Sequence, residues 1–257
     1  MGTFKQKYQN ISIDGFDYPV LTRKEFAKFN TSILELGDVS KDGKYFEALA
    51  AIFDLEDFTS FCNQIDPHLV VPEYLSGFLD WLFKELSSEF KHKEDDKNTS
   101  LWAQLPFFAK FLGDGVLFLW STAGLDLGDL GNVVISLRSI CSKYSSGFLP
   151  PVKKTISKPP KRLRCGIARG QIISIGDQKD FVGPCINVAS RLQKIGQFSF
   201  AFSKRGFNLE KCFHKSYQEQ FLLIKEAIRG VGDEELVYVN KTEFDLLPEE
   251  EKKRLLP

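Results

Sequence analysis

A turn between two apolar segments constrains the fold of this chain more than any other feature of its sequence. The runs LPFFAKFL and VLFLW flank Gly113-Asp114-Gly115. An Asp-Gly pair between strand-like runs is the strongest short-range signal for a β-hairpin. We therefore predict a hairpin over residues 105–120, with the carboxylate of Asp114 at its tip.

The segments around this hairpin alternate between strand and helix patterns. The run ALAAIFDL, which follows Tyr45, has the length of a strand, and apolar residues between Pro72 and Phe90 recur with the period of an amphipathic helix. A second helix is predicted within residues 129–144. Further strands are predicted in RLRCGIARGQIISIG, broken into two runs at Gly170, and in EELVYVNK. This alternation favours an α/β protein with a helical layer on a mixed sheet.

The chain divides into three predicted parts. Residues 1–45 are polar and form an N-terminal arm, residues 46–240 form the main domain, and residues 241–257 form a charged C-terminal tail. Within the domain, we expect KHKEDDKNTS, residues 91–100, to be a surface loop without regular structure. The Pro/Lys-rich segment LPPVKKTISKPPKR should form neither helix nor central strand, because proline lacks a backbone N–H. Residues 150–161 of this segment have no assigned role beyond a solvated loop.

The composition excludes several classes of protein. The 34 Lys and Arg residues balance 34 Asp and Glu residues, so the chain lacks the basic character of a protein that binds a long nucleic acid. No run approaches the roughly 20 apolar residues that span a bilayer, and the N-terminus lacks the apolar core of a signal peptide, so we expect a cytoplasmic protein. The five cysteines are widely spread without a C-x-x-C pair, which indicates neither a disulfide framework nor a zinc site.

Polar residues stand at three places where a purely structural role would not put them. Asp54 follows a buried strand, Asp114 lies at a hairpin tip, and Asn187 and Arg191 share one helical face. Two converging carboxylates would bind a hard cation, and Mg²⁺ with a polyphosphate suits so sparse a ligand set. Taken singly, these residues also fit a strand end, an Asp-Gly turn, a helix N-cap and a solvated helix position.

Together, five blocks in this order resemble the class III nucleotidyl cyclase family, the adenylate and guanylate cyclases. The blocks are FDLEDFT, KFLGDGVLFLW, RCGIARGQIISIG, DFVGPCINVASRL and AIRGVGDEELVYV. They resemble, in turn, the family's F-x-D-I-x-G-F-T start, its K-x-x-G-D hairpin, its G-I-x-x-G strand pair, its D-x-x-G-x-x-V-N-x-A-S-R helix and its closing K-G-x-G-x-x-x-x-Y-x-V strand. The resemblance covers about residues 46–240. It implies a ferredoxin-like core that works as a head-to-tail homodimer with active sites at the interface.

The resemblance also implies roles for single residues. Asp54, Asp114 and the backbone carbonyl of Leu55 would bind two Mg²⁺ or Mn²⁺ ions. Asn187 would orient the ribose, and Arg191 would stabilise the transition state in which a nucleoside triphosphate becomes a 3′,5′-cyclic nucleotide and pyrophosphate.

Three further positions would contact the substrate. Arg229 stands where the family usually has a lysine that holds the triphosphate, and Lys110 and Asp180 occupy the two base-reading positions. In the family, Lys with Asp reads adenine, because a Lys donor and an Asp acceptor match its ring nitrogen and exocyclic amine. Cytosine presents the same pair of groups, so these two residues do not separate ATP from CTP, and uracil fits them poorly.

Other features resemble one subgroup more closely. Asp57 replaces the usual glycine of the first block, and ALAAIFDLEDFT leads into DPHLVVPEYL and then KFLGDGVLFLW. We expect a stand-alone form with no sensor or membrane domain attached. This arrangement resembles the bacterial pyrimidine cyclases of the Pycsar antiphage system, which make cyclic CMP or cyclic UMP for a separate effector. We therefore expect CTP or UTP as the substrate. An adenylate cyclase is the first alternative, and an inactive cyclase-homology module that only binds nucleotide is the second.

Overall fold

The computed structural model of the chain describes residues 7–257, which belong to two compact units. One unit consists of the N-terminal residues up to Tyr45 together with Ile173–Val182. The other consists of Phe46–Ile172 together with Gly183–Pro257. The long strand β8 (Leu163–Ile175) contributes residues to both units.

The first unit contains a small hairpin of strands β1 (Gln9–Ile13) and β2 (Phe16–Val20). Helix α1 (Arg23–Phe26) and a 3₁₀ turn (Thr31–Leu34) follow it. Every residue from 7 to 45 is at least partly exposed, so this stretch has no core of its own. Strand β9 (Asp180–Val182) pairs in antiparallel fashion with the last residues of β8.

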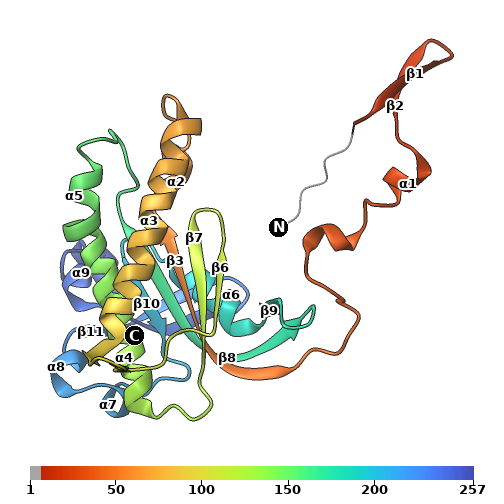
Figure 1. Cartoon of the computed structure of the whole chain (residues 1–257). Coiled ribbons are helices and arrows are strands. Elements are labelled where there is room, and N and C mark those ends of the chain that lie inside the picture. The colour runs from red at the N-terminus through yellow and green to blue at the C-terminus, as the bar shows by residue number, and fades with distance from the viewer. Residues whose placement is uncertain (1–6) are drawn as a thin grey trace. The chain divides into compact units, whose positions relative to one another are not determined.

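The second unit is built on a mainly antiparallel sheet, which Figure 1 shows beside its helices. The strand order is β11-β12-β10-β8-β3-β7-β6, and β8 and β10 are the parallel neighbours. The strands are β3 (Tyr45–Leu55), β6 (Phe108–Phe111), β7 (Gly115–Ser121), β10 (Phe200–Ser203), β11 (Phe221–Ile228) and β12 (Gly232–Asn240). This architecture confirms the predicted α/β class with its mixed sheet and helical layer.

Side-chain alternation along the strands creates two cores, one on each face of the sheet. In β10, Phe200 and Phe202 belong to the larger core, whereas Ala201 belongs to the smaller one. The larger core also takes its residues from helices α3 (Pro67–Phe90) and α4 (Leu127–Lys143). The smaller core includes residues of α6 (Pro184–Leu192), α9 (Lys241–Asp245) and α10 (Glu249–Leu255). Short helices complete this unit: α2 (Phe58–Phe61), α5 (Leu149–Val152), α7 (Leu209–Cys212) and α8 (Lys215–Gln218).

The hairpin predicted over residues 105–120 is confirmed as the antiparallel pair β6 and β7. The Leu112 N–H donates to the carbonyl of Gly115 at 2.9 Å. Gly113 has a φ of +100°, a left-handed conformation that glycine adopts without steric cost. Both predicted helices are present as well, although α3 begins at Pro67 rather than Pro72, because a proline fits the first position of a helix.

Three local predictions were wrong. Residues 91–101 contain a second small hairpin, β4 (Lys91–Glu94) with β5 (Thr99–Leu101), which is closed by N–H bonds to the carboxylate of Asp95. Residues 149–152 form the helix α5, which continues from α4 through a π-helical turn (Tyr144–Phe148); the π turn changes the hydrogen-bond pattern just ahead of the two prolines, so their missing N–H groups are accommodated. Strand β8 runs through Gly170 without a break.

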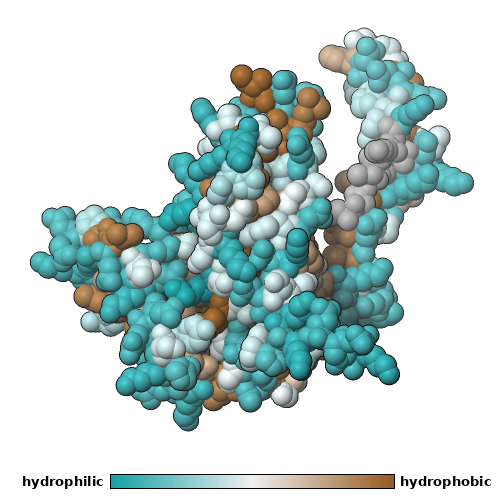
Figure 2. Space-filling view, turned by 60° about the vertical axis from the view of Figure 1, so that its left-hand side comes forward, coloured by the Kyte–Doolittle hydropathy of each residue, from teal (hydrophilic) through white to brown (hydrophobic). Residues whose placement is uncertain are grey.

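Residues 241–257 form α9 and α10, which bury Phe244, Leu247 and Leu255 in the smaller core. The acidic first turn and basic last turn of α10 suit the helix dipole. Most of the surface visible in Figure 2 is hydrophilic, with apolar residues gathered in a few small places. Among the helices formed by residues 7–257, none is both long and apolar enough to cross a membrane.

Candidate active site

The candidate site begins at the buried end of strand β3. Residues 48–55 of β3 are all buried, and Asp54 is only 6% exposed. The Cα partner of Asp54 on β7 is Gly115, and the Leu55 N–H donates to the carbonyl of Asp114 at 2.9 Å. The sheet therefore brings the two predicted metal-binding aspartates to neighbouring strand ends.

Gly115 makes this close approach feasible. A Cβ atom at this position would lie 1.9 Å from the carbonyl oxygen of Phe53. No side chain larger than hydrogen fits there, so the glycine after Asp114 is a packing requirement of the strand pair that carries the site.

Burial and neighbouring charges shift the pKa of the Asp54 carboxyl group in opposite directions. Burial raises its pKa, the hydrogen bonds and charge of Arg164 oppose this rise, and the negative charge of Asp114 adds to it. The net pKa lies above the ordinary value for aspartate. A cation close to both carboxylates would relieve their mutual repulsion and the cost of burying a charge.

Arg164 is a site residue that the sequence reasoning missed. Its Nη2 and Nε atoms donate to the same oxygen of Asp54, Oδ2, at 2.5 and 3.2 Å. Arg162 and Arg164 are two residues apart at the start of β8, as Asp54 and Glu56 are at the end of β3. That matched spacing of opposite charges, one pair in each of two strand-like runs, is the signal that could have identified them.

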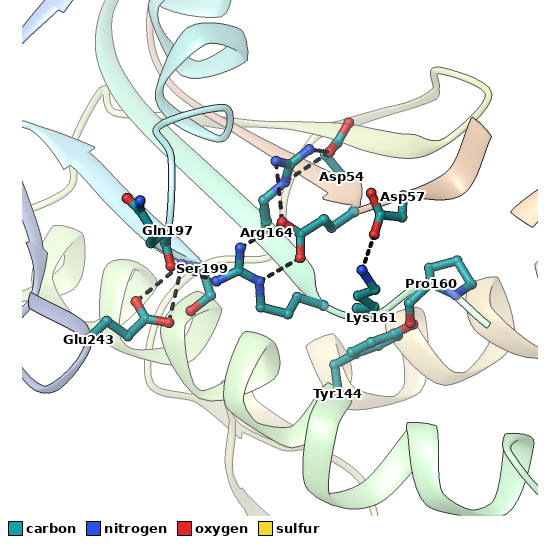
Figure 3. A network of polar contacts seen from close by, with 11 residues as sticks. Asp54, Asp57, Tyr144, Pro160, Lys161, Arg164, Gln197, Ser199 and Glu243 are labelled. Atoms are coloured by element: carbon teal, nitrogen blue, oxygen red, sulfur yellow. Dashed lines mark hydrogen bonds and ion pairs between the residues drawn. The ribbon is translucent and has the colours of Figure 1, made fainter. Parts of the chain in front are cut away.

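Two further ion pairs extend this contact away from Asp54, as Figure 3 shows. Arg162 binds Glu56 through two hydrogen bonds of 2.6 Å, and Lys161 Nζ lies 2.7 Å from a carboxylate oxygen of Asp57. The backbone joins the same segments, because the Glu56 N–H donates to the carbonyl of Arg162 at 2.9 Å. The end of β3 and the start of β8 are thus fixed to each other by main-chain and side-chain bonds.

The two predicted catalytic residues lie on helix α6. Asn187 and Arg191 are both exposed and one turn apart. The helix packs tightly on β8, since a Cβ at Gly166 would lie 2.2 Å from the carbonyl of Ala189. Within residues 7–257, no described hydrogen bond or ion pair joins Arg191 or Asn187 to either aspartate. The positive charge of Lys194, just past this helix, does act to lower the pKa of Asp54.

The three predicted substrate-binding residues lie on other elements. Lys110 is half-buried on the edge strand β6, opposite Leu117 of β7. Arg229 is exposed in the turn between β11 and β12. Asp180 lies in β9 of the first unit, where its carboxylate is buried and accepts a bond from the Phe181 N–H at 2.8 Å. The pairing of Lys110 with Asp180 around a base stays a prediction.

The oxygen donors at the strand ends suit a hard divalent cation. Among residues 7–257, no group of three or more His, Cys, Asp or Glu side chains could hold a metal ion by itself. Asp54 and Asp114 offer two carboxylates, and Leu55 offers a backbone carbonyl beside them. Mg²⁺ commonly takes one or two protein carboxylates and completes its shell with water and ligand phosphates, so this sparse set fits an ion that binds together with a phosphate ligand.

Comparison with solved structures shows that the chain has the fold of adenylyl and guanylyl cyclase domains. The adenylyl cyclase CyaB from P. aeruginosa matches with a TM-score of 0.57 and 14% identity, over 78% of this chain and 96% of that one. The guanylyl cyclase Cya2 matches with a TM-score of 0.51 and 17% identity, over 78% and 94% of the two chains. The guanylate cyclase domain of RhGC from Catenaria anguillulae, in complex with GTP, matches with a TM-score of 0.51 and 16% identity, over 77% and 98%. No protein-family model and no curated protein matches the chain.

Proposed function

We propose that this protein is a nucleotidyl cyclase, which converts a nucleoside triphosphate to a 3′,5′-cyclic nucleotide and pyrophosphate. The observation that carries the proposal is the meeting of Asp54 and Asp114 at the ends of two paired strands, in a chain with the fold of cyclase domains. The proposed catalytic domain spans residues 46–240.

In the proposed reaction, the ribose 3′-oxygen forms a bond to the α-phosphorus and releases its proton to solvent. The bond from the α-phosphorus to the bridging oxygen breaks, and pyrophosphate leaves with that electron pair. Asp54, Asp114 and the Leu55 carbonyl would hold two Mg²⁺ or Mn²⁺ ions. When bound, these ions would lower the pKa of the attacking hydroxyl and neutralise the charge of the leaving group.

The remaining catalytic groups are proposed to act across a homodimer. Asn187 and Arg191 are exposed on one face of α6, where a second copy of the chain can present them to its neighbour's aspartates. Asn187 would orient the ribose, and the planar guanidinium of Arg191 would stabilise the charge that develops on the α-phosphate. Arg229 would bind the triphosphate, a role that needs only a cation in reach.

The proposed substrate is a pyrimidine triphosphate, CTP or UTP, and the proposed product is a signal for a separate cyclic-nucleotide effector in antiphage defence. The resemblance of the segments around Asp54 and Asp114 to pyrimidine cyclases supports this choice. ATP is the second candidate, because a Lys110 donor and an Asp180 acceptor match adenine as well as cytosine.

The direct test is to incubate the purified chain with Mn²⁺ or Mg²⁺ and each of the four labelled triphosphates, and to separate the products. We expect one main product, either cyclic CMP from CTP or cyclic UMP from UTP, and an equal amount of pyrophosphate. Asp54→Asn and Asp114→Asn should each abolish it, whereas Asp80→Asn, an exposed aspartate on α3, should not. Absence of any cyclic product would refute the proposed cyclase activity. A cyclic product from ATP alone would refute the proposed pyrimidine specificity.

The shared site has its own test. Chains carrying Asp114→Ala and Arg191→Ala should each be inactive as homodimers, but a mixture should recover activity because one of the two sites in a mixed dimer is then intact. A verified mixed dimer that stays inactive would show that each chain has a self-contained site.

A further inference from the structure

Arg164 occupies one oxygen of the carboxylate that the proposed reaction needs for a metal ion. The guanidinium and the carboxylate are both largely buried, with side-chain exposures of 17% for Arg164 and 8% for Asp54. Both guanidinium donors converge on one oxygen of Asp54. At that depth water screens the pair weakly, so the contact is stronger than a surface ion pair of the same length.

We propose that Arg164 is an internal counter-ion, which neutralises Asp54 in the metal-free chain and competes with a divalent cation for its carboxylate. This inference rests on the proposed function, since it takes Asp54 as a metal ligand. A guanidinium held on Oδ2 by two donors blocks that oxygen, and two cations cannot share it at contact distance without strong repulsion.

The surroundings provide for both positions of the arginine. Without any cation, Asp54 would be a buried charge without a counter-ion, which is costly, so the chain gains from a resident partner. A second acceptor for the released group is close by, because Nη1 of Arg164 lies 4.0 Å from Oε1 of Glu56. A side-chain rotation would carry the guanidinium from one carboxylate towards the other.

The backbone around Arg164 has little reason to move during this exchange. Arg162 holds Glu56 by two hydrogen bonds, and the main chains of these two residues are bonded to each other. Figure 3 shows Arg164 beside Asp54, with the contact between Lys161 and Asp57 nearby. Metal binding would therefore displace one side chain and would not require the backbone to move.

The test measures metal binding in the absence of nucleotide. Mn²⁺ is titrated into the full-length chain, and the free ion is followed by its electron paramagnetic resonance signal. Arg164→Gln should lower the Kd for Mn²⁺ by about tenfold, the effect of removing one competing charge-assisted contact. Lys161→Gln is the matched control: it removes a cation three residues away that pairs with Asp57, and should change the Kd by less than about twofold on the same scale.

A second variant and a second readout guard against misfolding. Arg164→Lys keeps the positive charge but cannot donate two hydrogen bonds from a planar guanidinium to one oxygen. Its Kd for Mn²⁺ should therefore lie between those of the wild type and Arg164→Gln. Mn²⁺ should also raise the thermal midpoint of either variant more than that of the wild type, because tighter binding to the folded state stabilises it more.

Two outcomes separate this inference from the proposed function. If Asp54→Asn abolishes Mn²⁺ binding while both Arg164 variants bind Mn²⁺ no more tightly than the wild type, the counter-ion role is wrong and the metal site stands. If Mn²⁺ binds no more tightly to the wild type and to Arg164→Gln than to Asp54→Asn, with or without added pyrophosphate, the metal site and the counter-ion role are both wrong.

Discussion

A buried pair of tyrosines offers a sharp test of how the start of β8 is held in place. Tyr74 of α3 and Tyr144, in a π-helical turn after α4, have their hydroxyl oxygens 2.7 Å apart, and Tyr144 also donates to the carbonyl of Pro160 at 2.7 Å. Pro160 directly precedes Lys161, the first of the cations in Figure 3. A carbonyl only accepts, so the single hydroxyl proton of Tyr144 goes to Pro160. Tyr74 must then be the donor between the two tyrosines.

This order of donors predicts unequal effects for the same chemical change. Tyr144→Phe leaves a buried Tyr74 hydroxyl and a buried Pro160 carbonyl unpaired, each costing about 1–3 kcal/mol, so the free energy of unfolding should fall by about 2–6 kcal/mol. Tyr74→Phe leaves the bond to Pro160 intact and should cost about 1 kcal/mol. Adding Tyr74→Phe to Tyr144→Phe removes an orphaned hydroxyl, so the second change should cost almost nothing.

The assay is urea unfolding of the wild type, both single variants and the double variant, followed by circular dichroism at pH 7. Burial raises the pKa of Tyr144 to about 12, so both hydroxyl groups are neutral at this pH. Thermal midpoints should fall by about 2–4 °C per kcal/mol for a chain of this size. Tyr217→Phe, at an exposed tyrosine, is the control. Equal losses for the two single variants, or strict additivity in the double variant, would refute the assigned donor order.

Three further predictions concern packing, thiol reactivity and pH. Gly115→Ala should destabilise the chain by about 3 kcal/mol or more, because the new Cβ would overlap the carbonyl of Phe53. Gly77→Ala, in open space on α3, should stabilise the chain by about 0.5–1 kcal/mol. If urea unfolding gives both variants a change of the same sign, this packing argument is wrong. Cys62 should be the first thiol to react with Ellman's reagent in the native chain, since the other four cysteines are buried, but it should react more slowly than a free thiol because burial and the charge of Asp114 raise its pKa; a second thiol that reacts as fast as Cys62 would show a looser core. Arg162 holds the pKa of Glu56 below its ordinary value, so the stability that this carboxylate adds is complete above the pKa it has in the unfolded chain and is lost as the pH falls through its lower folded pKa. The stability difference between the wild type and Glu56→Gln should therefore narrow on acidification from pH 7, and a constant difference would contradict the ion pair.

Local patterns were sufficient for the elements that frame the site. The Asp-Gly turn predicts a hairpin from about a dozen neighbouring residues, and the helical spacing of apolar residues predicts α3 and α4. Both predictions need only local sequence and no knowledge of the fold. Taken singly, Asp54 and Asp114 fit a strand end and an Asp-Gly turn, and they became candidates because five blocks in order resemble one enzyme family.

The contacts that complete the site depend on pairing between distant segments. Arg164 and Asp54 are 110 residues apart, and nothing local to either residue says that β8 lies beside β3. The errors at residues 91–100 and 149–152 have a different origin. Charge and proline content argue against long elements, but they permit a short exposed hairpin and a first helical turn.

The contrast between β3 and β6 has a consequence for how such a protein could change its substrate. The carboxylate of Asp54 is carried by a strand enclosed on both faces, where most substitutions would damage the folded state itself. Lys110 sits on the outermost strand, bonded to a neighbour on one side, and Arg229 sits in an exposed turn. If Lys110 helps to select the base and Arg229 binds the triphosphate, substitutions at these two positions can change substrate binding without disturbing β3. The other base-reading position, Asp180, is buried and would tolerate fewer substitutions.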